Sequence, residues 1–105
     1  AVPDNFMIQK LENGKQDIRL INWEYAGMQD PDLDIAMFSI YSLYERDQID
    51  NLISIYYENK VDLVTKYKIY AYVAIAGLLW SNWCEYKRLL GVDFGEYSLK
   101  QYRYA

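Results

Sequence analysis

The sequence predicts a mainly helical domain that begins with a small β-hairpin. Two short apolar segments with strand character flank an Asn-Gly pair within the first 23 residues. From residue 31 onward, apolar residues instead recur every three or four positions, which is typical of amphipathic helices. The 105 residues are 52% hydrophobic. That length supports one hydrophobic core and not two, so we expect a single domain over residues 1–105.

The hairpin is expected over about residues 5–23. Phe6-Met7-Ile8 begins the first strand, and the run from Asp17 to Trp23 forms the second. Asn13-Gly14 lies between them and tolerates the positive φ angles of a tight turn. An isolated hairpin is only marginally stable in water, so this one should pack on the helices or on another part of the protein.

Four helices are expected after the hairpin, over about residues 31–45, 47–58, 62–90 and 94–104. Asp30 can cap the first, with Pro31 at a position where its missing N–H costs nothing. Asp47 and Asp93 are the expected caps of the second and fourth helices, and the third should begin near Asp62 and stop at Gly91. The middle of the third helix is apolar on nearly all sides, so this helix should be central.

Composition excludes several classes of partner. The net charge is −4 and no basic stripe is present, so we expect no nucleic-acid partner. The longest apolar run, from Ile69 to Trp80, is shorter than the roughly 20 residues of a membrane span, so we expect no membrane insertion. A lone Cys84 is typical of a reducing compartment, and no secretory leader is evident. These features predict a cytoplasmic protein.

Residue types also exclude several kinds of catalysis. The chain has no His and one Cys, so it cannot build a Ser-His-Asp triad, a Cys-His pair or a thiolate zinc site. It has no glycine-rich phosphate loop of either common spacing. Cys84 lies within the expected third helix, and we interpret it as a small core residue.

The run from Leu20 to Ala36, LINWEYAGMQDPDLDIA, resembles the metal-binding motif of the choline and ethanolamine kinases. The family motif reads close to Ile-Asp-Trp-Glu-Tyr-Ala-Gly-Met-x-Asp-Pro, and Asn22 stands where the family has Asp. The resemblance implies that Asn22 is a Mg²⁺ ligand. An amide oxygen carries no formal charge and holds Mg²⁺ less well than a carboxylate, so metal binding should be weak. The alternative is that Asn22 only shapes a turn at the end of a strand.

A second resemblance precedes the first. Residues from Val2 to Ile8 look like the end of the family's His-x-Asp-x-x-x-x-Asn loop, with Asn5 as its final Asn. The resemblance implies a second metal ligand at Asn5 and a catalytic Asp one position before Ala1. We therefore expect a fragment, the helical C-terminal lobe of a protein-kinase-like fold, without the catalytic Asp or the nucleotide-binding lobe. Asn5 is otherwise an ordinary loop residue.

Cofactor binding follows from the same resemblance. ATP and Mg²⁺ would serve the intact protein, and neither is expected on the fragment. Asp34 matches a family Asp that braces the catalytic loop from behind, but it could equally be a first-turn carboxylate that favours the helix N-terminus.

Two further segments resemble the family's substrate-binding region. Residues 78–83, LLWSNW, look like its Trp-x-x-Trp helix, and residues 91–97, GVDFGEY, look like the turn that follows. Aromatic faces hold a quaternary ammonium group by cation–π attraction, which contributes about 0.5–2 kcal/mol per ring. The alternative is that the tryptophans belong to the core. The resemblance implies a choline pocket lined by Trp80, Trp83 and Tyr97, with Tyr41 and Tyr72 as further walls.

The resemblances together predict part of a kinase that transfers the ATP γ-phosphate to the hydroxyl of choline or a related amino alcohol. The fragment itself should be inactive. An aminoglycoside or sugar phosphotransferase-like kinase and a non-catalytic helical interaction module are the alternatives. A fragment would also leave apolar surface uncovered, so we expect it to self-associate.

Overall fold

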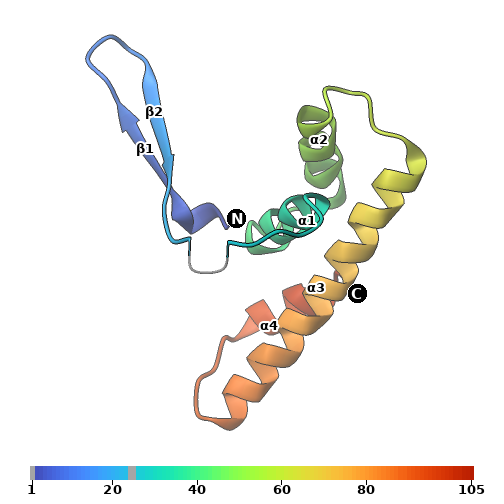
Figure 1. Cartoon of the computed structure of the whole chain (residues 1–105). Coiled ribbons are helices and arrows are strands. Elements are labelled where there is room, and N and C mark those ends of the chain that lie inside the picture. Colours follow the sequence, from blue (N-terminus) through green and yellow to red (C-terminus); the bar gives the residue numbers. More distant parts are fainter. Residues whose placement is uncertain (1, 24–25) are drawn as a thin grey trace.

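The computed structural model describes residues 2–23 and 26–105 and contains a β-hairpin followed by four helices (Figure 1). The predicted mainly helical fold class is confirmed. A short 3-10 helix, Pro3–Asn5, leads into β1 (Phe6–Lys10) and β2 (Gln16–Leu20). The helices are α1 (Asp32–Tyr41), α2 (Arg46–Tyr56), α3 (Leu63–Leu89) and α4 (Glu96–Tyr102).

The strands β1 and β2 pair antiparallel, from Phe6 opposite Leu20 to Lys10 opposite Gln16. The turn between them is closed by the backbone N–H of Leu11, which donates to the carbonyl of Lys15 at 2.8 Å. Gly14 lies in this turn at φ +78°, a left-handed conformation that glycine adopts without a steric penalty. The expected hairpin is therefore present, with its turn at the Asn-Gly pair.

The starts of α1 and α3 use the expected acidic residues. An Oδ1 of Asp30 accepts from the backbone N–H of Asp32 at 3.0 Å, although Pro31 takes the N-cap position itself. Asp62 caps α3 by accepting from the backbone N–H of Thr65 at 2.6 Å. Each bond satisfies a backbone donor that has no partner inside the helix.

Two predicted caps are wrong. Glu45, not Asp47, caps α2: its carboxylate accepts from the backbone of Gln48, while the Gln48 side chain accepts from the backbone N–H of Glu45 at 2.8 Å. This reciprocal pair satisfies two backbone donors at once, which Asp47 alone cannot do. At α4 the N-cap is Gly95, and Asp93 instead accepts from the N–H of Gly95 at 2.8 Å, ahead of the first helical residue.

The buried hydrophobic core is formed by residues of α1, α2 and the long helix α3. Both α1 and α4 pack along α3, which confirms its central place (Figure 1). Gly77 permits the close approach of the chain's C-terminal end, because a Cβ there would lie 2.6 Å from Tyr104 Cβ and 2.7 Å from the Gln101 carbonyl oxygen. The buried hydrophobic core comprises Ile35, Ala36, Ile40, Ile49, Ile53, Ile69, Val73 and Ala76.

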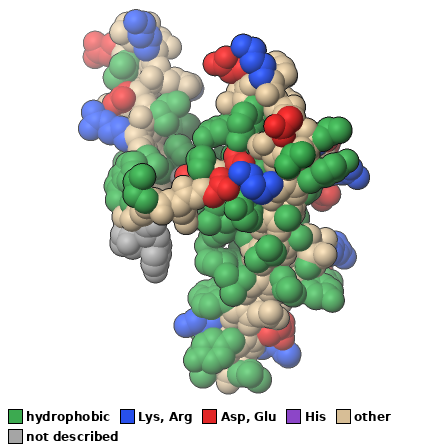
Figure 2. Space-filling model, turned by 45° about the vertical axis from the view of Figure 1, so that its right-hand side comes forward, with side chains coloured by type: hydrophobic (Ala, Val, Ile, Leu, Met, Phe, Trp, Pro, Cys, Tyr) green, Lys and Arg blue, Asp and Glu red, His purple; other side chains and the backbone are tan. Residues whose placement is uncertain are grey.

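The hairpin projects away from the helices, and the molecule is less compact than most chains of its length (Figure 1). Its radius of gyration is 15.7 Å, against about 13 Å for a compact domain of this size. Figure 2 shows hydrophobic side chains spread over the visible face of the helical part. The expected self-association would depend on such exposed side chains. Within the part of the chain that the structure describes, no helix combines the length and apolar character needed to cross a bilayer.

Candidate functional site

One cavity brings together residues from both halves of the sequence. It has a volume of about 650 Å³ and lies between the base of the hairpin, the segment after β2, α1 and α3. Leu20 and Met37 contribute apolar lining. Six of the residues predicted from the sequence line it: Asn5, Asn22, Asp34, Tyr41, Trp80 and Trp83.

Backbone pairing of the hairpin brings the two asparagines to this cavity. The register of β1 and β2 continues past Phe6 and Leu20, because the N–H of Ile21 donates to the Asn5 carbonyl at 2.9 Å. Asn22 directly follows this bond and has φ +66°. Asn tolerates the left-handed region better than most residues, since its short side chain can bond locally. Both amides therefore lie at one end of the hairpin, although the two residues are 17 positions apart in the sequence.

Aromatic rings form one wall of the cavity. The Trp80 and Trp83 rings stack with centroids 5.9 Å apart and an interplanar angle of 25°, and Tyr41 meets Trp80 edge-on at 5.1 Å. Trp80 also packs against the core, whereas Trp83 is 40% exposed. A cation already lies near this wall, because Lys87 Nζ is 5.4 Å from the centroid of the Trp83 ring. The indoles are thus accessible from the cavity, although Trp80 contributes to the core as well.

The other two tyrosines do not line this cavity. Tyr97 lies further along the same aromatic row, through Phe94, whose ring centroid is 5.3 Å from that of Trp83 and 6.4 Å from that of Tyr97. Tyr72 instead donates its hydroxyl to Asp30 Oδ2 at 3.0 Å. A substrate-binding role for Tyr97 or Tyr72 stays a prediction.

Trp23 is a cavity residue that the sequence does not single out as a site residue. Its indole Nε1 donates to the carbonyl of Leu20 at 2.9 Å, which holds the ring against the end of β2. The signal that could have found it is its position directly after Asn22, in the segment that resembles the family's metal-binding motif. Glu24 and Tyr25 of that motif lie outside the described residues, as does Ala1.

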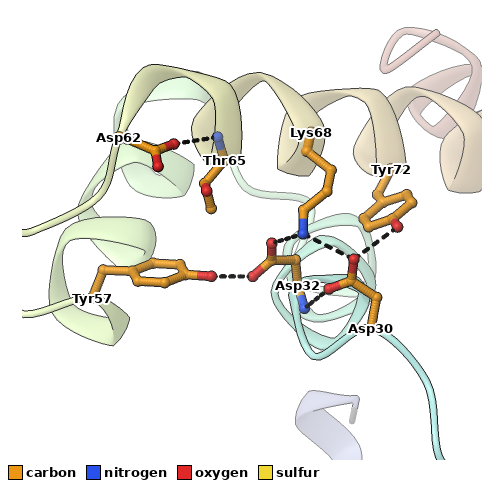
Figure 3. Close-up of polar contacts among 7 residues, drawn as sticks. All are labelled: Asp30, Asp32, Tyr57, Asp62, Thr65, Lys68 and Tyr72. Atoms are coloured by element: carbon orange, nitrogen blue, oxygen red, sulfur yellow. Dashed lines mark hydrogen bonds and ion pairs between the residues drawn. The ribbon is translucent and has the colours of Figure 1, made fainter.

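An ion-pair network anchors the segment between β2 and α1 to α3 (Figure 3). Lys68 Nζ lies 2.7 Å from Asp32 Oδ2 and 2.9 Å from Asp30 Oδ2. Asp32 is buried, and it accepts a further hydrogen bond from the hydroxyl of Tyr57. The Lys68 hydrogen bond is the main cause that lowers the pKa of Asp30, and both carboxylates raise the pKa of Lys68.

The network has a structural consequence for the cavity. The hydrogen bond to Asp32 raises the pKa of Tyr57 to about 12, so the phenol stays protonated and remains a donor. Lys68 and Tyr72 on α3, together with Tyr57 at the end of α2, hold the start of α1 in place. Asp34 is presented from the first turn of α1. Asp34 is exposed and lines the cavity, which is compatible with either of its two predicted roles.

The residues at this cavity fit Mg²⁺ poorly. Across residues 2–23 and 26–105, no three His, Cys, Asp or Glu side chains gather as a metal-binding group. Mg²⁺ sites usually use one or two carboxylates together with substrate phosphates and water. Asn5 and Asn22 supply only neutral amide oxygens, and Asp34 is the acidic residue that lines the cavity among those described. The described residues of this chain therefore do not form a Mg²⁺ site by themselves.

Comparison with known proteins finds similarity over nearly the whole chain. "Protein LicA" of Haemophilus influenzae is 29% identical over 108 residues, which covers 95% of this chain and 38% of that protein. A second "Protein LicA" from Haemophilus influenzae is also 29% identical, with 30% of its length covered. The chain thus spans about a third of the length of these curated relatives. No protein-family model matches the chain. No solved structure matches it either.

Proposed function

We propose that this chain is the C-terminal lobe of a choline kinase-like phosphotransferase. The observation that carries the proposal is the shared cavity, in which Asn5 and Asn22 lie with the stacked indoles of Trp80 and Trp83. The segments that contain the asparagines lie in the first third of the sequence, and the segment that contains the tryptophans lies in the last third. Each of these regions resembles the choline and ethanolamine kinases independently of the other. The distant similarity to LicA proteins gives weak support to a choline kinase-like family.

The aromatic wall would hold the quaternary ammonium group of the acceptor. A quaternary ammonium has no N–H to donate, so ring faces are better partners for it than hydrogen-bond acceptors. The walls formed by Tyr41, Trp80 and Trp83 would orient the acceptor with its hydroxyl toward the hairpin base, where Asn5 and Asn22 lie.

In the proposed reaction the acceptor oxygen bonds to the γ-phosphorus of ATP while the bond to ADP breaks. The hydroxyl proton must pass to a base, and the resemblance places that base before Ala1. A Mg²⁺ ion in the intact protein would supply charge neutralisation on the phosphates, and the described residues of this chain would offer it at most the amide oxygens of Asn5 and Asn22. The chain's own contribution is therefore to bind and orient the acceptor.

Choline binding by the chain tests this proposal directly. Choline and its uncharged isostere 3,3-dimethylbutan-1-ol are titrated against the protein, with tryptophan fluorescence and calorimetry as readouts. Choline should bind more tightly than the isostere, because only the cation gains cation–π attraction. Trp83→Ala should weaken choline binding about 2- to 30-fold, which corresponds to about 0.5–2 kcal/mol for one ring. Equal affinity for choline and the isostere would contradict the proposal.

Tyr86→Ala provides the matched control, because Tyr86 is an exposed aromatic residue on the same helix that does not line the cavity. It should leave choline binding unchanged. Lys87→Gln should strengthen choline binding, since the ammonium of Lys87 lies 5.4 Å from the Trp83 ring and repels a second cation. Binding of an aminoglycoside or a sugar in place of choline would favour the related phosphotransferase alternative.

A non-catalytic module is the second candidate function, and the neutral donor set at the cavity is the observation that favours it. The variant Asn22→Asp, made in the longer protein of which this chain is proposed to be a part, distinguishes a weak kinase from a non-catalytic module. For a weak kinase, the restored carboxylate should raise Mg²⁺ affinity and phosphotransfer from ATP to choline. An Asn22→Ser variant controls for the change of side chain. If Asn22→Asp shows no gain over Asn22→Ser in either measurement, the result supports the non-catalytic module.

A further inference from the structure

A second and larger cavity lies on another part of the molecule. Its volume is about 790 Å³, and its walls come from the α1–α2 connection, the start of α2, the first half of α3 and the C-terminal end of α4. It shares no described lining residue with the candidate site. Its size falls within the range of about 300–1,000 Å³ that is usual for small-molecule sites.

The lining of this cavity is positively charged, in contrast to the chain as a whole. The whole chain is acidic, with net charge −4. The cavity nevertheless gathers Arg46, Lys66, Lys100 and Arg103, while Glu45 is its one acidic lining residue among those described. These four cations come from three different helices and from the residue that follows α4. These cations are therefore not the solvated face of a single helix.

Three of the four cations form no ion pair among the described residues, while Glu45 lies in the same lining and Arg46 acts electrostatically on Asp50. Lys66 Nζ pairs with Asp50 at 2.9 Å. In contrast, Arg46, Lys100 and Arg103 form no ion pair with any residue in the ranges 2–23 and 26–105. Arg46 instead lies over the Tyr70 ring, 5.9 Å from its centroid. Three cations therefore remain available to an anionic ligand.

The rest of the lining is aromatic and aliphatic. The Tyr70 hydroxyl donates to Asp50 at 2.8 Å, and the Tyr104 hydroxyl donates to the Tyr44 carbonyl at 2.9 Å. Because both hydroxyls are already bonded within the protein, these tyrosines offer mainly ring surface to a ligand. Val73 and Ile49 add apolar surface.

We propose that this cavity binds a small phosphomonoester that carries an aromatic or apolar body. A planar guanidinium group can donate two parallel hydrogen bonds to two oxygens of one phosphate, and a phosphomonoester dianion can pair with more than one cation. A bare phosphate would leave most of 790 Å³ unfilled, so the aromatic and aliphatic lining is expected to cover an apolar group. The site is separate from the proposed choline pocket, and neither proposal depends on the other.

Phenyl phosphate is the probe for this cavity, and inorganic phosphate and phenol, which correspond to its two halves, are titrated for comparison. Phenyl phosphate should bind more tightly than either half in calorimetric titrations. The double variant Lys100→Gln/Arg103→Gln should weaken it at least about tenfold, because charge-assisted hydrogen bonds to the phosphate are lost. The control Lys10→Gln/Lys15→Gln removes the same charge from the exposed hairpin and should change the affinity less than about twofold.

NMR spectra locate the bound probe independently of affinity. Backbone signals of Tyr70, Val73 and Tyr104 should shift with phenyl phosphate, while the indole signals of Trp80 and Trp83 stay in place. Lys100 and Arg103 are exposed, and the thermal transition of each variant confirms that it is folded. Four outcomes would each overturn the proposal. The two double variants could lose affinity for phenyl phosphate equally, or phenol could bind as tightly as phenyl phosphate. A Glu-rich peptide could bind more tightly than phenyl phosphate, or phenyl phosphate could shift the indole signals of Trp80 and Trp83.

Discussion

The hairpin and the helical part differ sharply in how they are stabilised. All five residues of β1 are exposed, including Met7 at 58% and Ile8 at 62%. In the helices, by contrast, Ile40, Ile49, Ile53 and Ile69 are at most 2% exposed. The hairpin depends on its own hydrogen bonds and on a small contact surface, and isolated two-stranded hairpins are marginal.

The difference matters for function because the candidate site spans the boundary. Asn5 and Asn22 belong to the exposed hairpin end, whereas Trp80 and Trp83 belong to the well-packed helix α3. The expected packing of the hairpin on the helices is found at its base, where Phe6 meets Phe38 edge-on at 5.9 Å. The aromatic wall of the cavity is therefore built on the well-packed helix α3, whereas the two amides have little support from the helical core.

The largest expected effect comes from the core. Ile40→Ala should lower the free energy of unfolding by about 2–5 kcal/mol, because it opens a cavity at a side chain with no exposed surface. Ile8→Ala in the hairpin should lower it by at most about 1 kcal/mol, since that side chain faces solvent. Urea denaturation followed by circular dichroism measures both. Similar losses for the two variants would show that the hairpin is part of the same cooperative core.

Gly77→Ala tests how closely the C-terminal end packs on α3. A Cβ at this position would lie 2.6 Å from Tyr104 Cβ, so α3 and the chain end must move apart. We expect a loss of about 1–3 kcal/mol in the free energy of unfolding, as for other overpacked sites. The same substitution at Gly27, where nothing lies within 4 Å of the added Cβ, is the control. A Gly77→Ala protein as stable as the Gly27→Ala control would refute this close packing.

A smaller effect is expected at the base of the hairpin. Phe6→Ala removes the edge-on contact with Phe38, and an aromatic pair contributes about 0.5–1.5 kcal/mol beyond area burial. The loss should appear mainly as faster hydrogen exchange of the β1 and β2 amides, with α3 amides little affected. Phe6→Leu, which keeps an apolar side chain, should have an intermediate effect. Equal acceleration in α3 would mean that the hairpin does not open independently.

The smallest expected effect is on the stability of the protein at acidic pH. The Lys68 hydrogen bond lowers the pKa of Asp30 below its usual 3.8, so this interaction stabilises the fold above that pH. The stabilisation is lost as the pH falls through the lowered pKa, where the folded protein must take up a proton. Asp30→Asn should therefore flatten the fall of the thermal midpoint below about pH 4.

Lys68→Met should flatten the same acid dependence, because it removes the main cause of the shift. Some acid dependence should remain in both variants, since Lys66 independently lowers the pKa of Asp50. An unchanged dependence in Lys68→Met would show that the ion pair does not contribute to stability in solution.

Local signals in the sequence predict the elements well. Asn13-Gly14 marks the hairpin turn, Asp62 the start of α3 and Gly91 its end, and each acts through backbone atoms a few positions away. Prediction fails where two local signals compete. Asp is a commoner cap than Glu, which favours Asp47, but the reciprocal pair of Glu45 with Gln48 satisfies two donors instead of one.

The sequence by itself determined the helical class, the order of the elements and the residue types at the candidate site, because periodicity and motifs are properties of neighbouring residues. Only the tertiary structure decided which of those residues share a cavity. It placed Trp80 beside Tyr41 and separated Tyr72, which bonds to Asp30 instead. It also gathered four cations into a second cavity. Such contacts join residues tens of positions apart, so they depend on how helices pack and not on any local pattern.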